Sequence, residues 1–238
     1  MVAKTDILNE ISENGYLILE NFQNDLNSFR EEVEKKYRKT LTKNKISSIG
    51  DIEDYHKLAI DDEQHKSLWT RANRNFNHEI ITNSDIFKYL ETNLGEISFS
   101  YMVDNNYPDI FWRLVRPNKM DVGSIHADIW FWDLNNWKVP ENKECLKIWM
   151  LLSKNIDLGL GVIDKSHKKD DWIYSNVSKD GLNKPEFDIL KNKYTTNDLI
   201  TPFGSAILFD YRLLHYGIYN TSNFSRISLE FTIYFNKK

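Results

Sequence analysis

The chain of 238 residues contains a single cysteine, Cys145. One thiol excludes an intramolecular disulfide framework, and it excludes a zinc site built from several cysteines. The first ten residues, MVAKTDILNE, are polar, so the chain does not open on an apolar signal sequence. No stretch approaches the roughly 18 consecutive apolar residues of a membrane-spanning helix. We therefore expect a cytoplasmic protein without a membrane partner.

Dense clusters of positive charge are also missing. The chain carries 31 Lys and Arg residues against 35 Asp and Glu residues, and its net charge is −4. Its basic clusters, at 36–43 and 165–169, are short and have acidic residues nearby. Because nucleic-acid-binding domains present a basic stripe, the sequence disfavours a nucleic-acid partner, and with it a nucleic-acid demethylase. It gives no indication of the oligomeric state.

The first third of the sequence has the apolar periodicity of helices. Apolar residues recur at helical spacing in segments 4–16, 24–41, 62–72 and 84–93. Gly15 can end the first helix, and Asn83 or Ser84 can cap the last one. Segment 16–22, YLILENF, has the pattern of a short strand. We therefore expect a mainly helical N-terminal part over residues 1–95.

From about residue 96 the apolar period becomes that of strands. Strand-like segments lie at 96–103, 110–117, 124–132, 145–153, 158–164, 205–210, 213–220 and 226–235. About eight strands at this spacing are typical of a sandwich or a barrel. The polar segment 168–200 interrupts them and predicts a long loop with one short helix. Since neither a repeat nor a linker is found, we expect one domain, 1–238, with its β core over 96–238.

The last predicted strand has one polar and one apolar face. The polar face carries Arg226, Ser228, Glu230, Thr232 and Tyr234, and the residues between them are apolar. The polar side of such a strand faces water or a cavity. An arginine fork beside a hydroxyl, as at Arg226 and Ser228, suits a carboxylate ligand. The alternative is that Arg226 pairs with Glu230 on the same face.

Two candidate metal ligands stand two positions apart in SIHADIWFWD, residues 124–133. On the predicted strand, His126 and Asp128 would point to the same face. With His215 they would form a set of two histidines and one carboxylate, which suits Fe(II) because three coordination positions stay open. An ordinary hydrogen-bonded His–Asp pair is the alternative. Of the other histidines, we expect His56, His65 and His78 at the surface and His167 in a structural turn.

At these residues the chain resembles the phytanoyl-CoA dioxygenase-like group of Fe(II)/2-oxoglutarate oxygenases. The similar segments are ISENGYLILENF, GSIHADIWFWD, GLGVIDKSHKKD and PFGSAILFDYRLLHYGIYNTSNFSRISLEF. They cover most of the chain in family order, with weak matching over 40–95 and 168–200. Asp164-Lys165 departs from the Pro-Gly that the family usually has in this turn.

The resemblance implies a mainly β fold with flanking helices, built on a double-stranded β-helix (jelly-roll, cupin-like) core. It implies a catalytic Fe(II) bound by His126, Asp128 and His215, with 2-oxoglutarate and O₂ as co-substrates. Such enzymes oxidise an unactivated C–H bond and release succinate and CO₂. The intact Asp128 favours hydroxylation, because related halogenases have a small residue there. Desaturation, epimerisation and ring closure are alternative outcomes of the same chemistry.

The resemblance also implies how small molecules are bound. Arg226, helped by Ser228, would hold the far carboxylate of 2-oxoglutarate. Trp149 matches an aromatic residue that lines the co-substrate pocket in relatives, and a core position is the alternative. The substrate would be a polar metabolite or a carbohydrate or natural-product intermediate, selected by segments 40–80 and 168–200. Residues that could contact it on the predicted strands are Arg113, Trp130 and Trp132, since both tryptophans would share the face of His126 and Asp128. The alternatives are a solvated strand position for Arg113 and packing at the barrel mouth for the two tryptophans.

Two other functions stay open. A cupin-like metalloenzyme could use the same three ligands without 2-oxoglutarate, although Arg226 and Ser228 count against it. A non-catalytic jelly-roll module could bind a ligand, although an intact set of redox-metal ligands counts against that.

Overall fold

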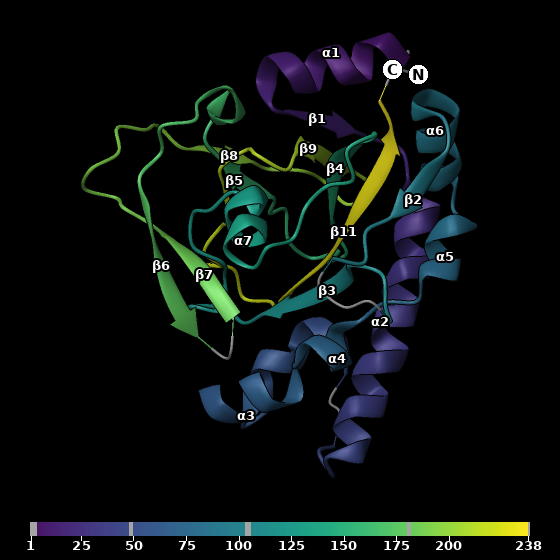
Figure 1. Cartoon of the computed structure of the whole chain (residues 1–238). Coiled ribbons are helices and arrows are strands. Elements are labelled where there is room, and N and C mark those ends of the chain that lie inside the picture. The colour runs from purple at the N-terminus through teal and green to yellow at the C-terminus, as the bar shows by residue number, and fades with distance from the viewer. Residues whose placement is uncertain (1–3, 48–49, 103–105, 180–181, 238) are drawn as a thin grey trace.

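The computed structural model describes residues 4–47, 50–102, 106–179 and 182–237 (Figure 1). Some predicted segments extend into residues 1–3, Val103 or residues 180–181, and these positions lie outside the described residues. The helices are α1 (Lys4–Asn14), α2 (Gln23–Lys43), α3 (Asp62–Leu68), α4 (Arg71–Arg74), α5 (His78–Thr82), α6 (Asp85–Leu94) and α7 (Asp128–Leu134). Short 3-10 turns lie at Ile52–Lys57 and Ser166–Lys168. No helix in these ranges is long and apolar enough to cross a membrane.

The helical N-terminal part is confirmed, and its boundaries have local causes. α1 ends at Gly15, which has a φ of 92°, a left-handed conformation that costs glycine little. The Ser84 side chain accepts a hydrogen bond from the Phe87 backbone at 3.2 Å and so caps α6. The predicted helix 62–72 is instead two helices, because α4 starts anew with Thr70 as its cap.

The strands are β1 (Tyr16–Leu19), β2 (Ile97–Phe99), β3 (Ile110–Val115), β4 (Lys143–Leu151), β5 (Leu160–Val162), β6 (Tyr174–Lys179), β7 (Leu182–Phe187), β8 (Asn197–Leu199), β9 (Ala206–Asp210), β10 (His215–Gly217) and β11 (Arg226–Asn236). The large antiparallel sheet has the order β1-β9-β4-β11-β2, and β3 also pairs with β11. A smaller sheet has the order β10-β5-β8, and β6 pairs with β7. Every predicted strand except 124–132 overlaps one of these strands.

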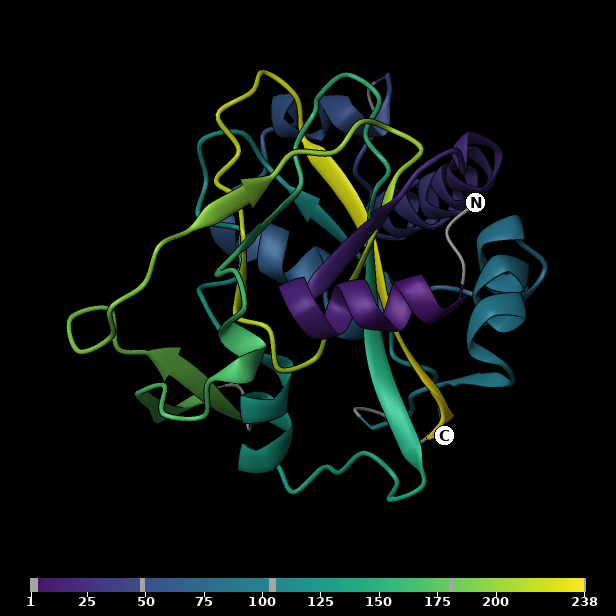
Figure 2. The ribbon, with the colours of Figure 1, turned by 90° about the horizontal axis from the view of Figure 1, so that it is seen from above.

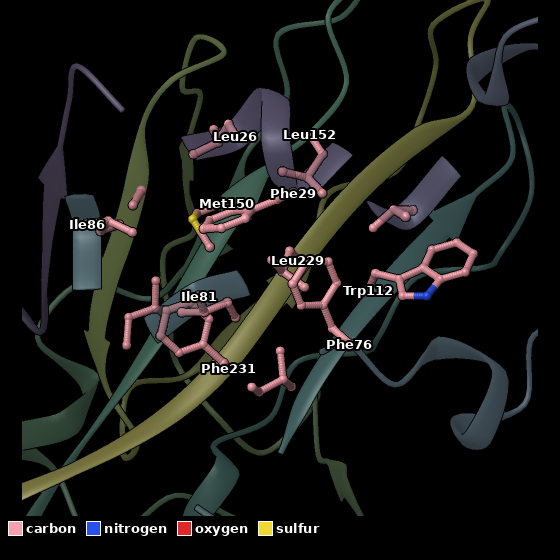
Figure 3. Packing of buried hydrophobic residues seen from close by; sticks show 14 of the residues in the cluster. Leu26, Phe29, Phe76, Ile81, Ile86, Trp112, Met150, Leu152, Leu229 and Phe231 are labelled. Carbon is pink, nitrogen blue, oxygen red and sulfur yellow. The ribbon is translucent and has the colours of Figure 1, made fainter. Parts of the chain in front are cut away.

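The apolar face of β11 is buried in the main core. Leu229 and Phe231 are fully buried there with Met150 of β4 and with Leu26 and Phe29 of α2 (Figure 3). Burying one such side chain contributes about 1.5–3 kcal/mol. α2 therefore covers the outer face of the large sheet and leaves the other face for the interior.

The opposite face of the large sheet meets the smaller sheet. Trp149, Ile207 and Phe209 pack there with Leu160 and Val162 of β5. α2 and α6 lie on one side of β4 and β11, whereas α7, β6 and β7 lie on the other (Figure 2). The polar face of β11 thus looks into the space between two sheets, and the reading of that face as a solvent-facing surface is wrong.

The strand predicted over 124–132 is wrong. His126 makes an isolated β-bridge with His215, and the chain then turns into α7 at Asp128. Strand propensity is overridden because both tryptophans of this helix find aromatic partners elsewhere in the chain. Trp130 stacks on Tyr174 with ring centroids 4.3 Å apart, and Trp132 stacks on Tyr211 at 5.1 Å.

Two further sequence predictions are wrong. Segment 168–200 is not a loop with a helix, because it contains the β6–β7 hairpin and β8. His65 does not lie at the surface: its exposed fraction is 8 %, and its Nδ1 lies 3.0 Å from the Tyr55 hydroxyl. Burial lowers the pKa of His65 to about 4.

Candidate active site

The structure brings His126, Asp128 and His215 together. The two histidines exchange both backbone hydrogen bonds of a β-bridge, at 3.0 Å and 2.9 Å, and their rings lie 4.4 Å apart. Asp128 follows as the first residue of α7, so the turn into the helix aims its carboxylate back at the bridge. One ligand atom from each side chain lies within 4.8 Å of the other two.

The hydrogen bonds around this cluster leave its ligand atoms available. Nδ1 of His126 faces the Ser124 carbonyl at 2.7 Å, and Nδ1 of His215 faces the Leu213 carbonyl at 3.0 Å. A carbonyl partner fixes the proton on Nδ1 and leaves the Nε2 lone pair for a metal. Burial and the neighbouring His126 lower the pKa of His215 to about 4, so its ring is neutral at pH 7.

One oxygen of the partly exposed Asp128 carboxylate is buried and unsatisfied. Its Oδ2 has no hydrogen-bond partner among the described residues and lies 3.9 Å from Nε2 of His215. Its Oδ1 lies 3.7 Å from the Lys147 ammonium. A buried carboxylate oxygen without a donor, beside two imidazole lone pairs, fits a divalent cation of the Fe(II) type.

The register of the large sheet places a polar patch next to this cluster. Opposed residues of antiparallel strands point to the same face. Ser228 of β11 is opposite Arg113 of β3, and Glu230 is opposite Trp149 of β4. Thr232 is opposite Lys147, the residue beside Asp128. The interior face of β11 therefore runs from Arg226 at one end towards the His–Asp–His cluster.

Arg226 is a buried cation without a carboxylate partner among the described residues. Its exposed fraction is 3 %, its Nη1 donates to the Ile218 carbonyl at 3.1 Å, and its Nε has no partner there. Burial and the nearby Arg113 lower its pKa to about 10. The predicted alternative, an Arg226–Glu230 pair, is wrong, because Glu230 accepts hydrogen bonds from Arg113 instead.

The Arg113–Glu230 ion pair lies between Arg226 and the metal cluster. Arg113 donates to one Glu230 oxygen from Nε at 3.1 Å and from Nη2 at 2.7 Å. Burial alone would raise the pKa of Glu230, but Arg113 and Lys147 lower it to about 2. Arg113 is 43 % exposed as a side chain, and the space that it faces is a cavity.

This cavity has a volume of about 390 Å³, within the usual range for a small-molecule site. His126 and Asp128 lie in its wall together with Lys147, Arg113 and Glu230. α4 and α7 contribute further walls, and so does β7. A larger groove of about 840 Å³, between α1 and the segment that joins α7 to β4, contacts none of the three candidate ligands.

The residues predicted to contact small molecules divide into two groups. Arg113 and Trp132 line the cavity. Trp130 and Trp149 do not: Trp130 packs among Tyr174 and Phe187, and Trp149 lies in the core between the sheets. Arg226 and Ser228 also lie outside the lining of this cavity. The expectation that both tryptophans of 124–132 share the ligand face is wrong, because a helix does not alternate its side chains.

Sequence reasoning missed much of the cavity lining. The missed residues include Arg71, Arg74, Asp109, Phe111, Phe131, Lys147, Lys184 and Pro185. Segments 40–80 and 168–200 were expected to select the substrate, and both contribute, through α4 and β7. A signal existed for Lys147, which is a lysine inside the otherwise apolar strand segment CLKIWMLLS.

Comparisons with known proteins agree with this fold. A 2-oxoglutarate complex of EvdO2 from Micromonospora carbonacea var. aurantiaca is similar, with a TM-score of 0.61, 15 % identity, and 97 % of this chain and 90 % of that chain covered. AviO1 from Streptomyces viridochromogenes Tue57 covers 99 % of this chain and 96 % of its own, with a TM-score of 0.56 and 10 % identity. SnoK, a non-heme α-ketoglutarate-dependent carbocyclase from nogalamycin biosynthesis, is similar with a TM-score of 0.55 and 14 % identity. The match covers 97 % of this chain and 83 % of the SnoK chain.

These likenesses confirm the jelly-roll fold expected from the sequence. No curated protein is similar enough in sequence to match the chain. The family model for phytanoyl-CoA dioxygenase (PhyH) matches residues 11–228. The chain therefore belongs to the phytanoyl-CoA dioxygenase family of oxygenases, which depend on Fe(II), 2-oxoglutarate and O₂.

Proposed function

We propose that this single-domain protein binds Fe(II) through His126, Asp128 and His215 and oxidises a small molecule in the adjacent cavity. The observation that carries the proposal is the cluster itself. Two imidazoles have their Nδ1 atoms engaged by backbone carbonyls, and a buried carboxylate oxygen beside them has no partner among the described residues. Three ligands on one side of a metal leave the other side for co-substrate and O₂.

We further propose that Arg226 binds the far carboxylate of 2-oxoglutarate, with Ser228 beside it. A buried guanidinium with an unsatisfied Nε needs an anionic acceptor, and no described carboxylate supplies one. Ser228 is 1 % exposed and lies on the same face of β11. When Fe(II) and 2-oxoglutarate are bound, they supply the oxidation of a C–H bond by O₂ with release of succinate and CO₂.

The reaction proposed is hydroxylation of a small polar metabolite or of a carbohydrate or natural-product intermediate. An intact Asp128 supports it, because that carboxylate occupies a metal position. The cavity wall supports it as well, since Trp132 and Phe131 offer aromatic faces and the charged residues offer hydrogen bonds. SnoK is named a carbocyclase, so product analysis must separate hydroxylation from ring closure.

The experiment is an anaerobic visible spectrum of the protein with Fe(II), before and after addition of 2-oxoglutarate. The expected result is a charge-transfer band that reports chelation of the metal by the keto acid. Arg226→Ala should weaken 2-oxoglutarate binding by about 100-fold, as expected for a lost buried charge pair. Arg38→Ala is the matched control, because Arg38 is exposed on α2.

Each alternative has its own outcome. Stoichiometric iron without a band points to a cupin-like metalloenzyme that does not use 2-oxoglutarate. Absence of iron binding points to a jelly-roll module that binds a ligand without catalysis. A band of equal affinity in Arg226→Ala contradicts the assignment of Arg226.

A further inference from the structure

We propose that the substrate carries an anionic group, a carboxylate or a phosphate, and that Arg74 binds this group. The inference rests on the proposed function and names the class of substrate for the same cavity. Two observations lead to it. Arg74 has no carboxylate partner among the described residues, and it lines the same cavity as His126 and Asp128. Arg226, the arginine proposed to bind the co-substrate, likewise has no described carboxylate partner.

Arg74 is held firmly in the cavity wall. It is the last residue of α4, and its Nε donates to the Trp69 carbonyl at 2.9 Å. The next residue, Asn75, forms an isolated β-bridge with Phe111 of β3, and the Phe76 amide donates to the Ile110 carbonyl at 3.1 Å. The guanidinium is therefore fixed at Nε, and its remaining donors are available to the cavity that it lines.

The described part of the chain offers Arg74 no carboxylate within 4.0 Å. Glu230 is the acid that acts on it most strongly, but Glu230 accepts both hydrogen bonds of Arg113. Burial, together with the positive charge of Arg113, lowers the pKa of Arg74 to about 10, so Arg74 stays charged at pH 7. Arg74 is partly buried, and a charge withdrawn from water is normally paired. The missing anionic partner of Arg74 is then a ligand.

The lining as a whole has an excess of positive charge. Its described cations are Arg71, Arg74, Arg113, Lys147 and Lys184, and its described carboxylates are Asp109, Asp128 and Glu230. Asp128 belongs to the metal cluster, and Asp109 accepts hydrogen bonds from Ser100 and from the Met102 amide. Arg113 pairs with Glu230, and the Lys147 ammonium lies 3.7 Å from Asp128. Arg74, in contrast, is a cation of the lining without a described carboxylate within 4.0 Å.

The remaining walls describe the body of the substrate. Phe111, Phe131 and Trp132 line the cavity alongside the charged residues. Arg71 lies 5.4 Å from the centroid of the Phe111 ring, a cation–π contact that keeps this side of the cavity both basic and apolar. A small acid with an apolar or ring-shaped body fits such a site, with the acid group at α4 and the reacting carbon towards His126.

The test uses the protein loaded with Mn(II) and 2-oxoglutarate. Mn(II) does not support the reaction with O₂, and it is paramagnetic. The probes are inorganic phosphate, followed by ³¹P relaxation, and acetate, followed by ¹³C relaxation. An anion bound in the cavity lies near the metal and relaxes faster, in a saturable way. Arg74→Gln should weaken this binding by about tenfold, the usual effect of losing a charge-assisted hydrogen bond.

The matched control is Arg38→Gln, which removes the same charge from the exposed face of α2 and should bind both probes like the wild type. If Arg74→Gln does not fold, Arg74→Lys replaces it. This variant keeps the charge but loses the planar fork, so it should still weaken binding several-fold. Whichever probe saturates at lower concentration identifies the substrate group as phosphate or carboxylate.

Three results overturn the inference. The first is the absence of saturable relaxation for both probes in the wild type. The second is equal binding in the Arg74 and Arg38 variants, which would indicate an anion bound directly to the metal. The third is loss of the Fe(II)–2-oxoglutarate band in Arg74→Gln, which would assign Arg74 to the co-substrate. Absence of that band in the wild type is different, because it contradicts the proposed function itself.

Discussion

Replacing Arg226 by methionine should make the metal-free protein more stable. The Arg226 guanidinium is 3 % exposed and donates to one carbonyl, that of Ile218. Its folded-state pKa, lowered from 12.5 to about 10, means that the charged form is disfavoured in the folded protein by about 3 kcal/mol. This destabilisation is present at every pH below about 10, because Arg226 is charged in both the folded and the unfolded state there.

Methionine has a similar length and no charge, so it removes that unfavourable energy. The variant loses the hydrogen bond to Ile218, which contributes about 1–2 kcal/mol. The net gain in unfolding free energy is therefore about 1–2 kcal/mol. For a chain of 238 residues this raises the melting temperature by about 2–8 °C.

The assay is thermal unfolding of wild type and Arg226→Met, first without metal and then anaerobically with Fe(II) and 2-oxoglutarate. In the wild type 2-oxoglutarate should raise the melting temperature, because a ligand that binds only the folded state stabilises it. In the variant that increase should be lost. A fall of several degrees in metal-free Arg226→Met would refute the reasoning, because it would show that the charge is already satisfied within the protein.

Three further predictions concern stability. Glu230→Gln should lower the unfolding free energy by about 2–3 kcal/mol at pH 7. Because the folded-state pKa of Glu230 is about 2, this stabilisation is complete above the unfolded pKa near 4.5 and declines as the pH falls towards 2. Urea unfolding at pH 3 should therefore show less than half of the difference, and a pH-independent difference would contradict this. Trp130→Ala should cost about 3–5 kcal/mol in the same assay yet leave the Fe(II)–2-oxoglutarate band intact, and a lost band in folded protein would place Trp130 in the site after all. Gly15→Ala should cost about 1–3 kcal/mol, because φ is 92° and a Cβ would lie 2.5 Å from Leu213, so unchanged urea unfolding would count against this close approach.

The sheet and the metal cluster could be predicted because their signals are local. Alternation in 226–235 predicted β11 and both of its faces, and the structure buries the apolar face completely. His126 and Asp128 were expected to lie together for the wrong reason. They come together across the junction of a β-bridge and a helix, where a spacing of two residues also turns both side chains towards His215.

The helix α7 and the cavity lining could not be predicted because their causes are distant in sequence. The segment DIWFWDL has β-branched and aromatic residues, and it is helical because its tryptophans stack on Tyr174 and Tyr211. Arg74 belongs to a four-residue helix without apolar periodicity. The bridge between Asn75 and Phe111 and the hydrogen bond from the Phe76 amide to the Ile110 carbonyl hold that helix against β3, and nothing in the local pattern indicates either contact.

The most direct test of the central claim is a crystal structure of the protein with Mn(II) and 2-oxoglutarate. The account predicts a metal bound by Nε2 of His126, a carboxylate oxygen of Asp128 and Nε2 of His215, with the far carboxylate of 2-oxoglutarate on Arg226. A metal held by other residues, or a far carboxylate bound away from Arg226, would contradict it.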